Sequence, residues 1–304
     1  DRLRSRGLGD VYKRQIINML NNGVVGHKHY NIFLIFEPKC RLVMSLSVKD
    51  KVINHFVTRY ILEAKLSKYL DCRNVATRKG MGTDYAIKKV IKYINILKRK
   101  YKIFYVLKLD ISKYFYCIDH EVLKGLLIDK LDDYEYNIVS EIIDTTNKEY
   151  INKTINKLKE DRDIPNYLYG KGLPIGNMTS QILAIFYLND MDHFIKEELK
   201  IKGYIRYQDD FLLFSESKEY LGVCLEKIKK FLEKEKLTLN GKTRIYSCNE
   251  NICFLGRNLY GQYAKRHTVR RKMKKRFYLL KEGKISLDSY IASRICYKNL
   301  MRKS

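Results

Sequence analysis

The sequence predicts an α+β fold in which helices cover one face of a small antiparallel sheet. Residues 103–109 (IFYVLKL) form a short apolar run that is typical of a buried strand. Two further apolar runs, 204–207 and 211–214, are separated by three residues, which indicates a tight hairpin. Strands and helices alternate along the chain, but no long series of strand–helix–strand units develops, which favours the antiparallel sheet.

The composition is that of a globular protein with a strongly basic balance. The chain has 304 residues, 45% hydrophobic and 31% charged, enough for one large or two smaller domains. Lys and Arg number 60 against 34 Asp and Glu, a formal charge of +26. Nucleic acid is the usual partner of such a chain. The alternative is that an AT-rich genome accounts for part of the lysine excess.

We expect a cytoplasmic protein with no membrane partner. No uninterrupted apolar run approaches the roughly 20 residues that span a bilayer, and no signal peptide is visible. Seven cysteines show no regular spacing, which predicts reduced thiols. Residues 1–15 lack apolar periodicity and resemble translated vector sequence. We expect a non-native or disordered leader there, and a genuine basic arm is the alternative.

In the first third of the chain, residues 32–44 predict two short strands joined by a basic turn. A helix is expected to begin near Ser47 or Asp50. The loop 73–82 is rich in basic residues and glycine, and Thr83 is expected to cap a second helix. The apolar face of that helix comprises Ile87, Val90, Ile91, Ile94 and Leu97.

The remaining segments carry weaker patterns. In chain order we expect a helical stretch over 120–146, irregular chain over 151–170, a glycine-containing loop at 172–176, a long amphipathic helix over 179–200, a helix over 218–235, a second hairpin from 243–247 and 252–260, and a basic helical tail from 269.

Three carboxylates stand out because of their positions. Asp209 and Asp210 lie in the turn of the predicted hairpin, and Asp110 ends the buried strand. Adjacent carboxylates repel by about 4 kcal/mol at ~4 Å and an effective dielectric of 20, and a cation removes that cost. Three such groups suit two Mg²⁺ ions, which can activate a hydroxyl and stabilise a leaving oxygen in phosphoryl transfer. The alternative is that they are ordinary turn and capping residues.

The runs 172–181 (GLPIGNMTSQ) and 205–213 (IRYQDDFLL) resemble bacterial reverse transcriptases, closest to diversity-generating retroelements and the neighbouring unclassified or defence-associated groups. Ile175 replaces a commonly found Gln, which supports that subgroup. The other matching segments follow in the family's order: 37–56 and 78–83 match its fingers motifs, and 106–123, 239–243 and 254–256 match its palm motifs.

The resemblance implies a right-hand polymerase: a palm on the small sheet, fingers, and a truncated helical thumb. The expected divisions are the leader at 1–15, fingers at 16–102, palm at 103–119, a helical insertion at 120–165, palm again at 166–262 and a partial thumb at 263–304. The short tail and the absent start methionine predict a fragment.

For the reaction centre, the resemblance implies that Asp110 and Asp209 hold two Mg²⁺ ions, or Mn²⁺ as a substitute, with Asp210 beside them. Ile111 is implied at the metal and nucleotide site. Phe115 is implied to exclude a ribose 2′-hydroxyl, and the alternative is a core phenylalanine. Lys39 and Arg41 are implied to grip the triphosphate, and the alternative is that they are solvated surface charges.

Further residues are implied to contact the nucleic acid or the leaving group. Gly176, Asn177 and Gln181 match positions that pack on the template and incoming nucleotide. Lys242 matches a lysine that protonates pyrophosphate, or is a hairpin-edge lysine. The implied primer and template contacts also include Arg78, Phe254, Leu255 and Gly256, of which 254–256 are otherwise ordinary strand core.

The implied activity is RNA-directed DNA synthesis from deoxynucleoside triphosphates. The partners would be an RNA template and a DNA or RNA primer, with room for an accessory protein. An inactive or truncated nucleic-acid binder is the alternative, and an RNA-templated RNA polymerase is disfavoured by Phe115. The biological role stays open between diversity generation, retrohoming and phage defence, and Gln208 has no assigned role.

Overall fold

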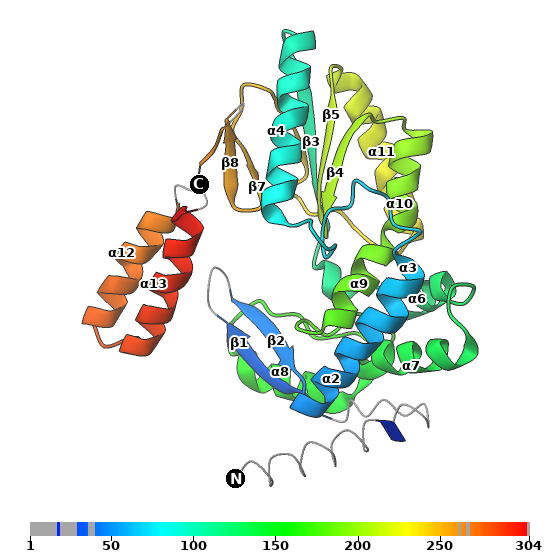
Figure 1. Ribbon diagram of the computed structural model, residues 1–304, viewed down its shortest axis with the longest axis vertical. Coiled ribbons are helices and arrows are strands. Elements are labelled where there is room, and N and C mark those ends of the chain that lie inside the picture. Colours follow the sequence, from blue (N-terminus) through cyan, green and yellow to red (C-terminus); the bar gives the residue numbers. More distant parts are fainter. Residues whose placement is uncertain (1–16, 19–28, 36–39, 261–262, 266–267, 303–304) are drawn as a thin grey trace.

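The computed structural model describes residues 17–18, 29–35, 40–260, 263–265 and 268–302 (Figure 1). The predicted leader, 1–15, lies outside the described residues. Within the described part of the chain, no helix is long and apolar enough to cross a membrane.

A four-stranded antiparallel sheet forms the centre of the molecule, in the order β4-β5-β3-β6. Its strands are β3 (Tyr105–Asp110), β4 (Gly203–Tyr207), β5 (Asp210–Ser215) and β6 (Arg244–Ser247). The predicted buried strand is β3, and the predicted hairpin is β4 with β5. Both predictions are confirmed, and the sheet places the two predicted segments side by side in its middle.

Helices cover both faces of this sheet (Figure 1). On one face, Leu107 packs in a core with α9 (Met178–Tyr187) and α11 (Lys218–Lys234), which is the helical layer that the sequence predicts. On the other face, Val106 packs with α4 (Thr83–Lys100). Neighbouring residues of a strand point to opposite faces, so this apolar strand needs two layers, and the second was not part of the prediction.

A smaller unit lies across a gap from the sheet in Figure 1. It contains the predicted hairpin of β1 (Asn31–Ile35) and β2 (Arg41–Ser45). The helix α2 (Val48–Phe56) follows, and the hydroxyl of its N-cap Ser47 accepts a hydrogen bond from the backbone N–H of Asp50, as expected for this region. The helix continues through a π-helical segment, Val57–Leu62, into α3 (Glu63–Leu66).

Residues predicted to be irregular form a helix instead, α8 (Glu149–Lys159). Ile151 and Ile155 lie one turn apart and are both buried. They pack with Tyr30 and Leu42 beside the first hairpin. Two apolar residues in a polar segment give a weak periodic signal, because most of the stability of a short helix comes from tertiary packing.

The prediction of one long amphipathic helix over 179–200 is wrong in its length and in its one-sided burial. The segment is divided into α9, α10 (Asn189–His193) and a π-helical turn, Phe194–Glu198. Eight of the ten residues of α9 are buried, so the helix is enclosed by protein. Its small and apolar residues fit contacts on every side, which a one-sided pattern does not describe.

Two other helical boundaries differ from prediction. The stretch 120–146 is divided into α6 (His120–Leu127) and α7 (Asp133–Ile143), followed by a 3₁₀ turn. A capping box at Asp132 starts the second helix, which explains the division. Thr83 is the first residue of α4, whose N-cap is Gly82, and no side chain caps it.

The second predicted hairpin is also wrong. β6 pairs with β3, whereas β7 (Ile252–Phe254) pairs with β8 (Arg257–Tyr260), which pairs with β9 (Tyr263–Lys265). The free edge of β3 must find hydrogen-bond partners, and β6 supplies them. Local sequence cannot distinguish this distant partner from the adjacent strand.

The basic tail is helical, as predicted. It forms α12 (Thr268–Lys281) and α13 (Leu287–Arg302), which pack on each other at one side of the molecule (Figure 1). The guanidinium of Arg276 donates to the hydroxyl of Ser289 at 2.8 Å and joins the two helices.

Candidate active site

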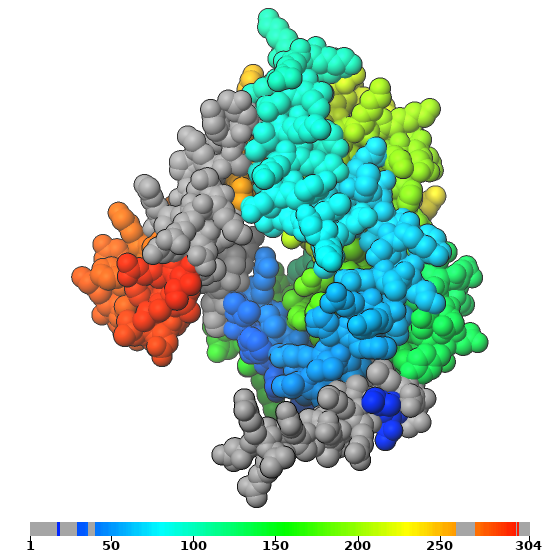
Figure 2. All heavy atoms as spheres, viewed as in Figure 1, coloured from blue at the N-terminus to red at the C-terminus, as the bar shows by residue number. Residues whose placement is uncertain are grey.

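The three predicted carboxylates come together at one end of the central sheet. Asp110 is the last residue of β3 and Asp210 the first of β5, and they are paired directly opposite each other. Asp209 lies in the turn between β4 and β5. This end of the sheet faces the smaller unit, and Figure 2 shows an open hollow between the blue part of the molecule and the cyan part that contains α4.

The turn that carries Asp209 has an unusual backbone. Gln208 has a φ of +58°, a left-handed conformation that non-glycine residues rarely adopt. Its side-chain amide donates to the hydroxyl of Thr77 at 3.0 Å, and Thr77 is left-handed as well, with a φ of +55°. The turn is therefore fastened to a loop 131 residues earlier in the chain, which gives Gln208 the structural role that the sequence did not reveal.

A buried ion pair fixes the strand that leads into this turn. Arg206 and Asp192 are both fully buried, and the Nε of Arg206 donates to Asp192 at 2.7 Å. Tyr204 also donates its hydroxyl to Asp192. The guanidinium reaches the carbonyl of Gln208 at 3.2 Å and that of Ile185 at 2.9 Å. Arg206 therefore joins the turn to α9 and α10.

Arg206 and Asp192 are not among the residues predicted from the sequence. Arg206 is a charged residue within the otherwise apolar and largely buried strand β4, and that is the signal by which it could have been found. A buried charge is tolerated only when it is paired and hydrogen-bonded, so one such residue predicts the other.

The loop before α4 adds a short extension to the sheet. The N–H of Val75 donates to the carbonyl of Arg206, and the N–H of Arg206 donates to that of Arg73, both at 3.0 Å. Arg78, predicted to contact primer or template, donates to the backbone of Asp71 at 2.8 Å. Its guanidinium therefore holds the loop that supports the turn carrying Asp209.

The environment of the carboxylates favours a cation. The pKa of Asp209 is raised to about 6, chiefly by burial; Asp210 and Asp110 contribute to this shift, while a backbone hydrogen bond and Arg41 oppose it. Burial also raises the pKa of Asp210, with Asp110 adding to the effect and Lys108 opposing it. Like charges directly opposite on paired strands destabilise a sheet, and a metal ion would offset that repulsion.

The carboxylate oxygens fit a Mg²⁺ ion whose other ligands are water and substrate phosphates. Among the described residues, no group of three or more His, Cys, Asp or Glu side chains is arranged to hold a metal ion alone. Lys108 lies 3.6 Å from Asp210 and also donates to the carbonyl of Cys253 at 2.8 Å. Mg²⁺ ordinarily takes one or two carboxylates and completes its shell with water and substrate phosphates, so two-carboxylate sites suit this arrangement.

The segment 239–243 supports Asp110 from the other side. The N–H of Asn240 donates to the carbonyl of Asp110 at 2.7 Å, and the N–H of Asp110 donates to the hydroxyl of Thr243 at 3.3 Å. Ile111 forms a bridge with Leu239 and its side chain is buried, so only its backbone can serve a ligand. Lys242 is exposed, and its role in leaving-group protonation stays a prediction.

Phe115 lies on the short helix α5 (Tyr114–Cys117), five residues after Asp110. It is partly buried against the main core, and its ring meets that of Tyr114 at 5.7 Å. Its carbonyl accepts from the N–H of Leu173 at 2.7 Å. The structure thus joins the predicted gate residue to the loop before α9.

That loop contains the predicted contacts Gly176, Asn177 and Gln181. Gly176 has a φ of +125°, and a Cβ there would lie 2.7 Å from the carbonyl oxygen of Met44. Its close approach is therefore to β2. The side chain of Asn177 is buried and donates to the hydroxyl of Tyr30 at 2.9 Å. Gln181 is exposed on α9, as is Met178, and its contact with the nucleotide stays a prediction.

The residues predicted to contact the triphosphate and the primer lie in different environments. Arg41, exposed at the start of β2, is close enough to lower the pKa of Asp209, whereas Lys39 lies outside the described residues. Phe254 is fully buried in the core beneath α4, and Leu255 and Gly256 form the left-handed turn between β7 and β8. A direct primer contact by these three stays a prediction.

A small antiparallel sheet with carboxylates at one end, facing an open hollow, is the arrangement of a polymerase-type fold. Residues 28–259 match the family model for reverse transcriptase (RNA-dependent DNA polymerase). The chain belongs to that family.

Solved structures share the fold. Telomerase from Candida tropicalis, in an apo form truncated from its C-terminal domain, has 16% identity and a TM-score of 0.56 over 79% of this chain and 55% of its own. Telomerase from Candida albicans, in complex with a fragment of telomeric RNA, has 17% identity and a TM-score of 0.54 over 80% and 46%. The chain thus spans about half the length of these proteins. No curated protein matches.

Proposed function

We propose that the protein is an RNA-directed DNA polymerase that adds deoxynucleotides to a primer 3′-hydroxyl. The observation that carries the proposal is the direct pairing of Asp110 with Asp210, beside Asp209 in its fastened turn. The family match and the basic charge support an RNA template and a DNA or RNA primer as partners.

The chain's own residues have distinct tasks in this proposal. Asp110 and Asp209 hold two Mg²⁺ ions, or Mn²⁺, which when bound supply activation of the hydroxyl and stabilisation of the leaving pyrophosphate. Arg41 offers positive charge toward the triphosphate. Phe115 restricts the space beside the sugar, and Gln181 contacts the base pair from α9.

The domain assignment also belongs to this proposal. We assign the palm to 103–119 and 166–262 because these ranges contain the whole central sheet. Fingers at 16–102, the insertion at 120–165 and thumb helices from 263 follow from it. The motif with Ile175 supports a bacterial, cytoplasmic enzyme near the retroelement and defence groups, and an accessory protein is compatible with these.

Primer extension tests the proposal directly. The protein is given an RNA template, an annealed DNA primer, the four deoxynucleotides and Mg²⁺. We expect template-dependent product that is reduced at least 100-fold by Asp209→Asn, because loss of a metal-bound carboxylate removes several kcal/mol of transition-state stabilisation. Asp161→Asn, at an exposed position after α8, is the matched control and should retain activity.

Other outcomes of the primer-extension experiment would contradict the proposal. Activity that persists in Asp209→Asn contradicts the assignment of the carboxylates. Absence of product from the wild-type protein, with tight and salt-sensitive binding of primer–template, would favour the alternative, a nucleic-acid binder without catalysis. Ribonucleotides that replace deoxynucleotides equally well would indicate an RNA polymerase.

A further inference from the structure

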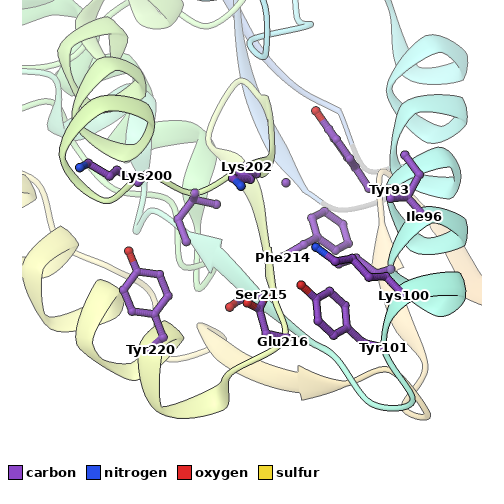
Figure 3. Close-up of a pocket in the computed structure, with 13 residues that line it drawn as sticks. Tyr93, Ile96, Lys100, Tyr101, Lys200, Lys202, Phe214, Ser215, Glu216 and Tyr220 are labelled. Atoms are coloured by element: carbon purple, nitrogen blue, oxygen red, sulfur yellow. The ribbon is translucent and has the colours of Figure 1, made fainter.

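A second cavity, of about 340 Å³, lies at the other end of the central sheet (Figure 3). Its lining includes Phe214 and Ser215, at the end of β5, whereas Asp210 begins that strand. At ~3.4 Å per residue, the cavity and the carboxylates are roughly 15 Å apart. Neither the proposed reaction nor its predicted residues use this site.

Four aromatic side chains line the cavity. Tyr93 and Tyr101 come from the C-terminal end of α4, and Tyr220 faces them from α11 (Figure 3). Phe214 is buried between them, and the ring of Tyr93 meets it at 5.7 Å. Tyr220 donates its hydroxyl to the carbonyl of Leu199, which fixes that wall. The rings are therefore held in place around the open space.

Gly203 leaves space at the base of the cavity because it has no side chain. A Cβ on Gly203 would lie 2.9 Å from the Cβ of Phe214, so a side chain at this position would displace the ring or fill part of the cavity. The neighbouring Ile201 is buried and apolar. The base of the cavity is thus apolar, which suits the face of an aromatic ring.

The rim is positively charged. Lys100, Lys200 and Lys202 line the cavity with Glu216 as its acidic residue. In Figure 3 the Lys200 amine points away, while those of Lys100 and Lys202 lie over the open space. Lys100 also lies 5.2 Å above the ring of Tyr101. An anionic group is favoured at the rim, directly above a surface that favours a ring.

We propose that this cavity binds one nucleoside phosphate unit, with its base on the tyrosines and its phosphate at Lys100 and Lys202. Stacking on aromatic residues and phosphate contacts with lysines are how single strands are held without sequence preference. The volume lies at the lower end of the range for small-ligand sites. Glu216 can accept a hydrogen bond from a base amino group or a sugar hydroxyl. The unit belongs either to a nucleic-acid strand or to a free nucleotide.

Photo-crosslinking tests this site separately from the catalytic hollow. The probes are 4-thiouridine monophosphate and an octanucleotide that contains one 4-thiouridine, applied with excess unlabelled primer–template to occupy the hollow. We expect labelled peptides from 93–101 or 214–220. Labelling by both probes indicates a free-nucleotide site, and labelling by the octanucleotide alone indicates a strand site.

Charge variants complete the test. Lys100→Gln with Lys202→Gln should reduce labelling of these peptides at least fivefold, whereas Lys92→Gln with Lys98→Gln, exposed on α4 outside the cavity, should not. The proposal is overturned if labels map only elsewhere or if both double variants lose labelling equally. Displacement of the probe by poly-glutamate as readily as by oligonucleotide would also overturn it, in favour of an acidic peptide.

Discussion

At the scale of single residues, the candidate site depends on side chains that do not touch a substrate in the proposed reaction. Arg206 and Asp192 form a fully buried ion pair, and removing one partner of such a pair typically costs 3–5 kcal/mol because the other charge stays unpaired. The pair also holds the carbonyl of Gln208. The position of Asp209 is thus set through Arg206, which joins its turn to Asp192 on α10.

The link between Gln208 and Thr77 leads to a prediction about activity. Gln208→Met and Thr77→Val each preserve size and remove the hydrogen bond. We expect each to lower deoxynucleotide incorporation about fivefold, equivalent to about 1 kcal/mol for one neutral hydrogen bond. Because both variants break the same contact, the double variant should lose no more than the worse single variant. Multiplicative losses in primer extension would show that the two residues act independently.

At the scale of elements, the loop before α9 joins the two units of the molecule. The N–H of Met44 in β2 donates to the carbonyl of Ile175 at 2.8 Å, and Gly176 lies against the same strand. The smaller unit therefore contacts the loop that leads into α9. A change in this contact would move Arg41 relative to Asp209.

Glycine at 176 is therefore required by sterics. Gly176→Ala would bring a Cβ to 2.7 Å from the backbone oxygen of Met44, at a φ of +125°. We expect a loss of at least about 1–3 kcal/mol in the free energy of unfolding, measured by urea denaturation. The matched control is Gly125→Ala, in open space within α6, where alanine should be neutral or stabilising by about 0.5–1 kcal/mol. Equal stability of Gly176→Ala and the wild type would contradict the assigned contact.

Elements whose signal is local could be predicted from the sequence, and elements defined by distant partners could not. The strand before Asp110 and the hairpin around Asp209 have strong apolar runs, and their pairing is confirmed. The partner of β6 and the helix α8 depend on residues far along the chain. For the site, the carboxylates were predictable as a group, but the role of Gln208 depends on Thr77, which no local pattern identifies.

At the scale of the whole molecule, the main feature is a large excess of positive charge. A formal charge of +26 makes the chain repel itself unless a polyanion or counter-ions offset it. Several basic residues in the described part of the chain lie around the hollow and the second cavity, among them Arg41, Lys100 and Lys202. Binding of a polyanion should thus contribute to the stability of the protein as well as to its function.

The salt dependence of binding measures this contribution. We expect the affinity for a primer–template duplex to fall about 10³-fold or more between 50 mM and 200 mM salt, as for proteins that contact six or more phosphates. Fluorescence anisotropy over a salt series checks this. A nearly flat dependence would mean that the basic charge lies outside the binding surface, and Asp161→Asn should leave the slope unchanged.

The pairing of Asp110 with Asp210 joins strands separated by a hundred positions in the chain. The end of the sheet that carries these carboxylates therefore has no local precursor. During synthesis it cannot form until β5 has emerged and paired with β3, and no shorter N-terminal piece contains it. Because such long-range pairing is slow to form, recovery of activity on refolding should appear only when the sheet is complete. The appearance of activity would then indicate when the central sheet has formed.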